Sequence, residues 1–338
     1  MRLFEREPRL SRWQRARVSL SLAWKQFNQG WATFRQNGLA RLGIGLLLVF
    51  ALMAVAHPLL MGTLWPKGVY DPVLGYDLEA TPWPSPPEFP QHWLGTDAVG
   101  RDVLSMLMAA ARPSFTLAIA AALTTAVIST LFGALSAYFR GLLDSMVMNL
   151  AYTLLLLPVP IVMVIIGTAF YEEIGSLEFG LLYGILAGAS SATIVMRSHA
   201  LSLMNRPFIQ ASRVAGAGPF RIITRHLVPH MLPLASVHMM LTVTGAVVAN
   251  GFIAAFQGSR PDLRLNWGTM VYNAFFYTAI NPRFPWSMLV APSAALSLFA
   301  AAFYLVARGL QDVADPRRRE RLGSGKARQV GVGKGTED

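Results

Sequence analysis

The chain has 338 residues, of which 54% are apolar and only 14% are charged, against about 25% charged residues in an ordinary soluble domain. Mean hydropathy is +0.43, the net charge is +11 and there is no cysteine. These values argue against intrinsic disorder, and they exclude a disulfide-stabilised secreted module, a thiolate metal site and a cysteine nucleophile. A basic excess on so apolar a chain indicates a membrane protein before a nucleic-acid-binding one.

Residues 1–41 form a basic leader. Large apolar side chains recur in it at spacings of three and four residues, among arginines and a lysine, at Trp13, Leu20, Trp24, Phe27, Trp31 and Phe34. This pattern predicts an amphipathic helix that lies in the membrane interface. The alternative is a basic tail without structure of its own.

Six stretches are mostly apolar over about the 20 residues that a helix needs to cross a bilayer. They are 42–64, 115–138, 146–170, 179–196, 232–256 and 286–307, and no Asp, Glu, Lys or Arg lies in the central part of any of them. The third contains Pro158 and Pro160, which membrane helices tolerate when neighbouring helices cover the freed carbonyls, so it counts as one span. The sequence therefore predicts an all-α integral membrane protein with six transmembrane helices.

The basic residues are distributed unevenly between the two sides of this arrangement. With the N-terminus in the cytoplasm, 23 of the 29 Lys and Arg lie in cytoplasmic segments and 6 in outer ones. Because basic residues are retained on the cytoplasmic side, we expect both termini there. The outer segment 65–114 has five prolines within 81–90, which favour extended polyproline geometry, and its residues 101–112 fit a short amphipathic helix.

The longest cytoplasmic loop, 197–231, has five arginines and no acid. Pro207 and Pro219 stand where the first turn of a helix favours proline, with a Gly-Ala-Gly turn between them, and Pro229 is expected to end the second helix. The pattern predicts a helix near 207–215, a glycine turn, and a helix near 219–227.

In that second helix one face is expected to carry Phe220, Ile223, Thr224 and Leu227, opposite Arg221 and Arg225. An ordered loop of this length between two spans is expected to dock a partner. A basic hairpin resting on anionic lipid is the alternative that the residues leave open.

Residues 210–216, Gln-Ala-Ser-Arg-Val-Ala-Gly, with Pro229 thirteen residues beyond the glycine, resemble the EAA motif, the cytoplasmic coupling loop of permease subunits in binding-protein-dependent ABC importers. Residues 221–230 look like the peptide-permease version of it. Two positions depart from the motif, since its Glu is Gln210 here and its second Ala is Ser212. Glutamine keeps the shape and hydrogen bonding of Glu but loses the charge, so coupling geometry or the partner ATPase is expected to differ.

Four further strings resemble the C-type subunit of dipeptide, oligopeptide and nickel importers. Residues 94–105 resemble its LGTD-x-x-GRD signature, 34–43 the start of its first span, 266–270 its last loop and 309–317 its end. The five resemblances cover about residues 34–317. One stretch, 252–258, departs from the family's glycine-rich sequence, and the substrate stays open between peptides, oligosaccharides and nickel complexes.

The resemblance implies a Type I importer permease (MetI-like) fold in the cytoplasmic (inner) membrane of a prokaryote. It divides the chain into the leader 1–41, a peripheral first helix 42–64, the outer segment 65–114, a core permease domain 115–308 with the coupling loop 197–231, and a basic tail 309–338. The implied partners are a second homologous permease, two ABC ATPase subunits, an extracytoplasmic substrate-binding protein and membrane lipid, but no nucleic acid. The chain itself is expected to bind no cofactor or metal, since the partner ATPases bind ATP and Mg.

By the same resemblance the chain is not an enzyme. It is expected to form half of a translocation pathway and to couple it to the ATPases through 205–229. The residues implied in coupling are Pro207, Gln210, Ala211, Ser212, Arg213, Gly216, Phe220, Arg221 and Pro229. Candidates for the pathway lining are His238, Thr242 and Asn250 of the fifth span, because ionisable residues within a membrane are often functional. A neutral His238 bonded to a neighbouring carbonyl is the alternative.

Two other classes of function fit the sequence less well. A secondary transporter or channel is the first of them. The predicted spans have no central carboxylate that could serve a proton or sodium relay. An intramembrane serine protease would need a GxSG motif, which Gly188-Ala189-Ser190-Ser191 narrowly misses. Small residues there favour close helix packing instead.

Overall fold

The computed structural model describes residues 31, 34–170, 174–257, 265–280 and 286–314. Within these ranges the chain is helical, and its β-pairing is limited to isolated bridges. The helices are α2 (Gly38–Thr63), α3 (Lys67–Tyr70), α4 (Val103–Ala109), α5 (Ala111–Phe139), α6 (Gly141–Leu156), α7 (Val159–Ala169), α8 (Ser176–Ala187), the π-helical turn η1 (Gly188–Ala192), α9 (Thr193–Met204), α10 (Pro207–Val214), α11 (Pro219–Ile222), the π-helical turn η2 (Ile223–Leu227), α12 (Val228–Gln257), α13 (Trp267–Ile280) and α14 (Trp286–Ala314). Most of the predicted leader helix and most of the basic tail lie outside the described residues.

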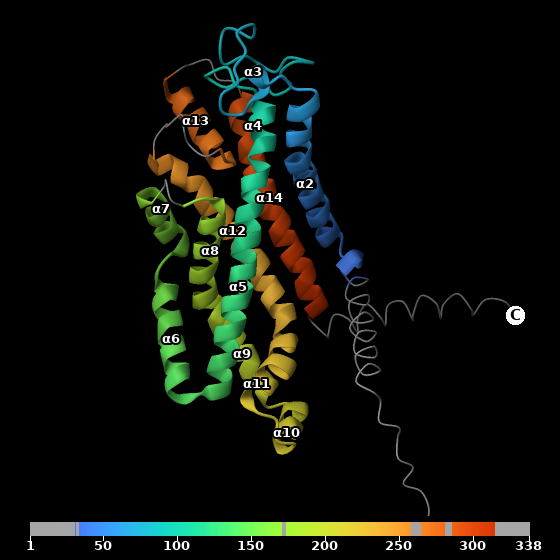
Figure 1. The fold of residues 1–338 in the computed structure, drawn as a ribbon, viewed down its shortest axis with the longest axis vertical. Helices are drawn as coiled ribbons and strands as arrows, with labels where there is room; N and C mark the ends of the chain where they lie inside the picture. Colours follow the sequence, from blue (N-terminus) through green and yellow to red (C-terminus); the bar gives the residue numbers. More distant parts are fainter. Residues whose placement is uncertain (1–30, 32–33, 171–173, 258–264, 281–285, 315–338) are drawn as a thin grey trace, which may run out of the picture.

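The long helices run along the long axis of one bundle (Figure 1). Residues 65–102, here called the cap, contain α3 and lie at one end. Residues 205–222, here called the tip, contain α10 and α11 and lie at the opposite end. The cap and the tip are therefore separated by the length of the bundle.

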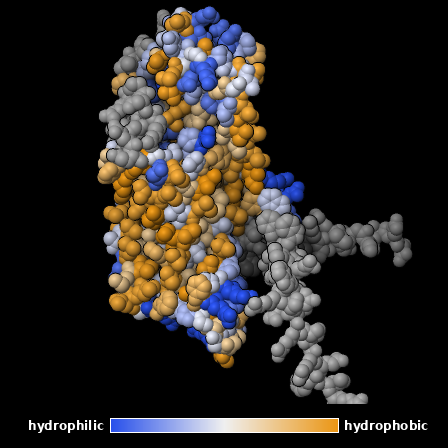
Figure 2. All heavy atoms as spheres, in the orientation of Figure 1, coloured by the Kyte–Doolittle hydropathy of each residue, from blue (hydrophilic) through white to orange (hydrophobic). Residues whose placement is uncertain are grey.

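Five helices are long and apolar enough to cross a membrane, namely Gly38–Thr63, Val103–Phe139, Ser176–Met204, Pro219–Ile253 and Trp286–Gln311. They coincide with five of the six predicted spans. On the face shown in Figure 2, apolar residues form a broad band around the middle of the bundle, and hydrophilic residues collect at its two ends. An apolar surface of this extent is one that lipid or protein partners must cover.

The remaining predicted span, 146–170, is not one helix. It is divided into α6 and α7, which are bent by 79° relative to each other. Leu157, between them, has extended backbone angles, and Pro158 precedes the first residue of α7. The residue before a proline avoids the helical region, whereas Pro160 stands in the first turn of α7, where a missing N–H is tolerated. The interruption expected at these prolines is a break between two helices, and 146–170 counts as the sixth span if the bent pair crosses the membrane as one.

A glycine face on α8 allows it to pack closely against α5. A Cβ at Gly184 would lie only 2.7 Å from the carbonyl oxygen of Ala121. The face repeats every four residues, at Gly180, Gly184 and Gly188. Small residues at this spacing let membrane helices approach one another, which agrees with the packing expected around Gly188.

The π-helical turn η1 joins α8 to α9 across a kink. Ser190 within it leaves the helical region, with φ −96° and ψ −117°. Its hydroxyl donates to the Ala187 carbonyl, and the hydroxyl of Thr193 donates to the Gly188 carbonyl. Carbonyls left by a widened turn need such partners in an apolar environment. The Ser190 hydroxyl therefore satisfies a backbone carbonyl at this turn.

Three clusters of buried apolar residues pack the described helices, and the two larger ones hold most of the bundle together. The cluster nearer the cap contains Trp267, whose ring packs against Phe299 and whose indole N–H donates to the Leu107 carbonyl at 3.0 Å. The second cluster lies at the tip end and joins α5, α9 and α12 to α10 and α11. The tip is therefore packed onto the bundle through a core that it shares with α5, α9 and α12.

One helix, α13, was not predicted. It lies between α12 and α14, in the stretch recognised only as a motif-bearing loop. Asn266 caps its start by accepting a hydrogen bond of 2.9 Å from the Thr269 N–H, and Gly268 packs against the backbone of Gly251 in α12. Asn is a preferred N-cap residue, so the sequence did contain an indication of where this helix starts.

Candidate functional site

The tip begins with a sharp corner between α9 and α10. Arg206 has extended backbone angles, as expected before a proline, and Pro207 begins α10. The side-chain amide of Gln210 donates a hydrogen bond of 3.0 Å to the carbonyl oxygen of Met204, the last residue of α9. The corner is thus fixed by a proline and by a side chain that satisfies a free helix-end carbonyl.

A Schellman motif ends α10. The N–H of Ala217 donates to the Ser212 carbonyl at 3.0 Å, and the N–H of Gly216 donates to the Arg213 carbonyl at 2.9 Å. Gly216 has φ +78°, a value that L side chains adopt only at a cost. Gly218 and Pro219 then begin α11. The predicted order of helix, glycine turn and helix is confirmed.

The second helix was predicted to end at Pro229, and this prediction is wrong. It passes from α11 through η2 directly into α12, and the N–H of Val228 bonds to the Ile223 carbonyl five residues earlier. Pro229 then stands in the first turn of α12, where its missing N–H is tolerated. The tip is therefore continuous with a long apolar helix of the bundle.

The face predicted for the second helix is also wrong. Ile222, Ile223 and Leu227 are buried, whereas Phe220 is 80% exposed and Thr224 is exposed. A π-helical turn takes more residues than an α-helical one, so it shifts which residues share a face. Phe220 consequently points away from the core of the tip.

The inward side of the tip is held by apolar and polar contacts. Ile209 is fully buried in the same cluster as Ile222 and Leu227. The hydroxyl of Ser212 donates to the Phe208 carbonyl at 2.9 Å, and the ring of Phe208 stacks on His230 with centroids 5.0 Å apart. These contacts make α10 and α11 one rigid unit on the end of the bundle.

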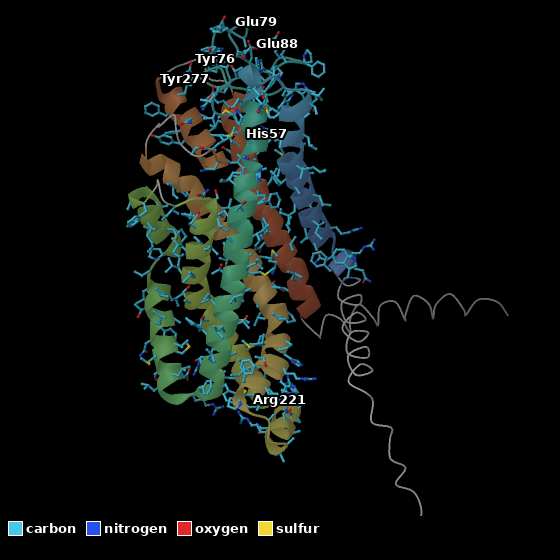
Figure 3. All side chains as sticks on the ribbon, viewed as in Figure 1. His57, Tyr76, Glu79, Glu88, Arg221 and Tyr277 are labelled. Atoms are coloured by element: carbon cyan, nitrogen blue, oxygen red, sulfur yellow. The ribbon has the colours of Figure 1, made fainter. Side chains whose placement is uncertain are left out.

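The outward side of the tip exposes apolar side chains. Val214 is 91% exposed, and Ala211 and Gly216 are exposed with it. Arg221 is exposed at the same end (Figure 3), and the guanidinium of Arg213 lies 5.6 Å over the ring of Tyr138 at the end of α5. A rigid unit with exposed apolar residues and cations can dock a partner.

Sequence reasoning missed an ion pair beside the tip. Asp144, in the first turn of α6, accepts two hydrogen bonds of 2.6 and 2.5 Å from the guanidinium of Arg197 in α9. The hydroxyl of Ser136 in α5 also donates to Asp144. One carboxylate therefore joins three helices. Asp144 is the sole acid between residues 103 and 171, which was the available indication.

The proposed pathway residues lie elsewhere. His238, Thr242 and Asn250 are all half-buried on α12, and the Thr242 hydroxyl donates to the His238 carbonyl at 2.9 Å. The His238 ring makes no hydrogen bond with any other part of the chain that the structure describes, so the carbonyl-bonded alternative gains no support. Their role in a pathway stays a prediction.

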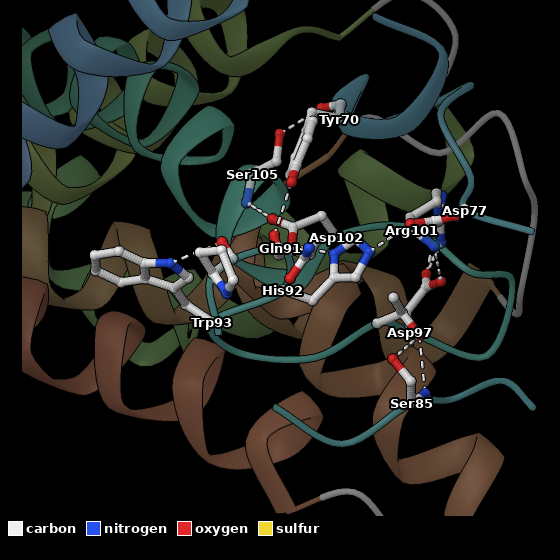
Figure 4. A network of polar contacts seen from close by, with 12 residues as sticks. Tyr70, Asp77, Ser85, Gln91, His92, Trp93, Asp97, Arg101, Asp102 and Ser105 are labelled. Carbon is white, nitrogen blue, oxygen red and sulfur yellow. Dashed lines mark hydrogen bonds and ion pairs between the residues drawn. The ribbon is translucent and has the colours of Figure 1, made fainter. Parts of the chain in front are cut away.

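The LGTD-x-x-GRD stretch shapes the cap (Figure 4). One oxygen of Asp97 accepts from the backbone N–H groups of Val99 and Arg101, each at 2.9 Å, and the other pairs with the Arg101 guanidinium at 2.6 Å. Residues 82–84 bend, and a turn follows Glu88, so the proline-rich segment is an ordered loop but not the extended one that was predicted. The contacts of Asp97 therefore hold the turn at residues 97–101 of the cap in place.

His92 lies between two carboxylates in the cap and is only 2% exposed. Its Nδ1 is 2.8 Å from Asp102 and its Nε2 is 3.0 Å from Asp77. The hydrogen bond with Asp102, helped by that with Asp77, raises the pKa of His92, and the bond from His92 lowers the pKa of Asp77. Asp102 also caps α4 by accepting from the Ser105 N–H at 2.6 Å. No feature of the sequence had indicated His92.

Comparison with known proteins agrees with this architecture. A family model described as "Binding-protein-dependent transport system inner membrane component" matches residues 129–320. The "Dipeptide transport system permease protein DppC" of Bacillus subtilis is 30% identical over 299 residues, which is 88% of each chain. The "Oligopeptide transport system permease protein OppC" of the same organism is 27% identical over 90% of this chain and 93% of its own length. A "Putative peptide permease protein" of Brucella suis is 29% identical over 84% of this chain and 89% of its own length.

Proposed function

Because this chain belongs to the family of binding-protein-dependent transport system inner membrane components, we propose that it forms half of a translocation pathway and couples it to two ATPase subunits through the tip. The observation that carries the proposal is the tip itself, which is fixed to the bundle by a shared apolar core and exposes Val214 and Phe220. A rigid docking surface can pass a movement of the ATPases on to the bundle, because packed interfaces switch between discrete arrangements.

The orientation follows from charge. With six spans, counting α6 and α7 as one broken span, both termini and the tip lie in the cytoplasm and the cap lies outside. The loop 197–231, which contains the tip, has five arginines and no acid, whereas the segment 65–112 has more acids than basic residues. ATPases that use cytoplasmic ATP would meet the tip, and a substrate-binding protein would meet the cap side.

We propose peptides as the substrate class. Relatives that align over most of this chain have printed names that refer to dipeptide, oligopeptide or peptide transport. An oligosaccharide or a nickel complex is the alternative. In this proposal the chain is a non-catalytic subunit without a cofactor of its own, and ATP and Mg are bound by the ATPases.

Crosslinking tests the docking of the tip. The chain has no cysteine, so Val214→Cys places a single thiol for a photocrosslinker on the tip, and Leu74→Cys does the same on an exposed site of the cap. In the purified complex the probe at Val214 should capture an ATPase subunit and the probe at Leu74 should not. ATP-dependent uptake of a labelled dipeptide by the reconstituted complex tests the substrate. Uptake by the lone chain without ATP, or no ATPase adduct from Val214→Cys, contradicts the proposal.

A further inference from the structure

The tip and the turn η2 that follows it form a cationic surface without an acid of its own. Arg206, Arg221 and Arg225 are all exposed, and none forms an ion pair with a described residue. The sequence has no Asp or Glu anywhere from 179 to 261. The charge of this surface is therefore not neutralised from within the segment that builds it.

An acid at the same end of the bundle, Asp144 in the first turn of α6, is already paired. Asp144 holds Arg197 through both of its oxygens and accepts from the hydroxyl of Ser136 as well. A carboxylate with these partners has little capacity left for the arginines of the tip. Arg213 differs from the other arginines, since its guanidinium lies over the ring of Tyr138 and is partly engaged with the bundle.

The neutral residue at position 210 is part of the same arrangement. The Gln210 amide donates to the Met204 carbonyl at 3.0 Å. An ionised carboxylate only accepts hydrogen bonds, so a Glu could not make this contact. The contact therefore favours a neutral residue at position 210 of this chain, where the motif that the loop resembles has Glu.

We infer that the tip docks into an acidic groove on its partner ATPase. The floor of the groove is apolar and receives Val214 and Phe220, and its rim carries Asp or Glu side chains that face Arg206, Arg221 and Arg225. This inference rests on the proposed function and specifies the chemistry of the partner. Charge complementarity across a rim mainly speeds association and selects partners, whereas the buried apolar anchors hold the complex.

A protein partner fits this surface better than a lipid one. Figure 1 places α10 beyond the turn that joins α5 and α6, at the extreme end of the described bundle. Val214, on α10, is 91% exposed, and α10 lies at the end of the bundle, whereas the broad apolar band of Figure 2 lies around its middle. A residue that anchored in lipid would be expected beside that band.

The test measures the affinity of the ATPase subunits for the permease complex in nanodiscs of phosphatidylcholine alone, as a function of KCl concentration. Salt screens exposed charge pairs over about 10 Å at 0.1 M. Wild-type affinity should fall as KCl rises. The variant Arg221→Glu/Arg225→Glu should weaken binding by about tenfold at low salt and flatten the salt dependence. The control Arg308→Glu, an exposed arginine of α14 away from the tip, should leave both unchanged.

Each outcome is informative. If the double variant binds like the wild type, or if the salt dependence appears only when anionic lipid is added to the nanodiscs, the acidic groove is excluded. Phe220→Ala separates this inference from the proposed function. If Phe220→Ala weakens binding while the arginine variant does not, the tip docks the ATPase without an acidic rim. If neither variant nor Val214→Ala affects binding, docking through the tip fails altogether.

Discussion

The side-chain amide of Gln210 donates a hydrogen bond to the carbonyl oxygen of Met204, at 3.0 Å. This contact joins the first turns of α10 to the end of α9 and so sets the angle at which the tip leaves the bundle. An ionised Glu, the residue that the resembled motif has here, could not make this contact, because an amide can donate to a carbonyl and a carboxylate cannot.

The first prediction concerns this contact. Gln210→Glu should destabilise the corner by about 0.5–1.5 kcal/mol at pH 7, since the hydrogen bond is lost and a carbonyl and a carboxylate would face each other without a proton. Below pH 4, where the new carboxyl is protonated and can donate, part of the loss should be recovered. Hydrogen exchange of residues 205–217 measures the effect. Gln210→Met, which loses the bond without gaining charge, should show no such recovery.

The second prediction uses two neighbouring glycines. Gly216→Ala should cost about 1–2 kcal/mol, because residue 216 has φ +78° and Ala resists that conformation. Gly218→Ala should be neutral, since residue 218 has an ordinary φ of −69° and a Cβ there meets nothing. Gly216→Pro, which also loses the bond to Arg213, should uncouple ATP hydrolysis from peptide uptake while the protein still inserts. Normal uptake by Gly216→Pro would contradict the coupling role.

The third prediction concerns Asp144 and Arg197. Asp144→Asn should lower the thermal stability of the complex by about 1–3 kcal/mol, because it leaves a half-buried guanidinium without its counter-charge. Asp144→Asn/Arg197→Gln should cost less than the sum of the two single changes, since removing both charges leaves no orphan. Additive losses in this double-mutant cycle would show that the two side chains do not act as a pair.

The fourth prediction is a pH dependence in the cap. The raised pKa of His92 means that its contribution to stability is present below pH 6.5 and is lost as pH rises through the raised value. The lowered pKa of Asp77 means that its contribution is present above pH 3.8 and is lost as pH falls. Proteolysis of the cap in the purified complex should therefore be slowest between these limits and accelerate in alkali. His92→Gln should remove the alkaline response, and an unchanged response would assign it to another group.

Local patterns determined much of the fold. Runs of apolar residues located every long helix, and prolines and glycines located the two helices of the tip, because hydropathy and backbone preference are properties of the residues themselves. The same reasoning failed where a proline had two possible effects. Pro158 ends a helix, whereas Pro229 lies within the first turn of one. The difference depends on whether the surrounding structure accommodates the freed carbonyls, which no single residue specifies.

The sequence by itself thus determined that this protein is an apolar, multi-helical membrane permease of a recognisable family, and roughly which segment is its tip. Only the tertiary structure decided which side chains meet. Asp144 pairs with Arg197, which is 53 residues away in the sequence, and His92 lies between Asp77 and Asp102. Such pairs form because helix packing brings separate segments together, and the cost of burying a charge then demands a partner where the packing has placed one.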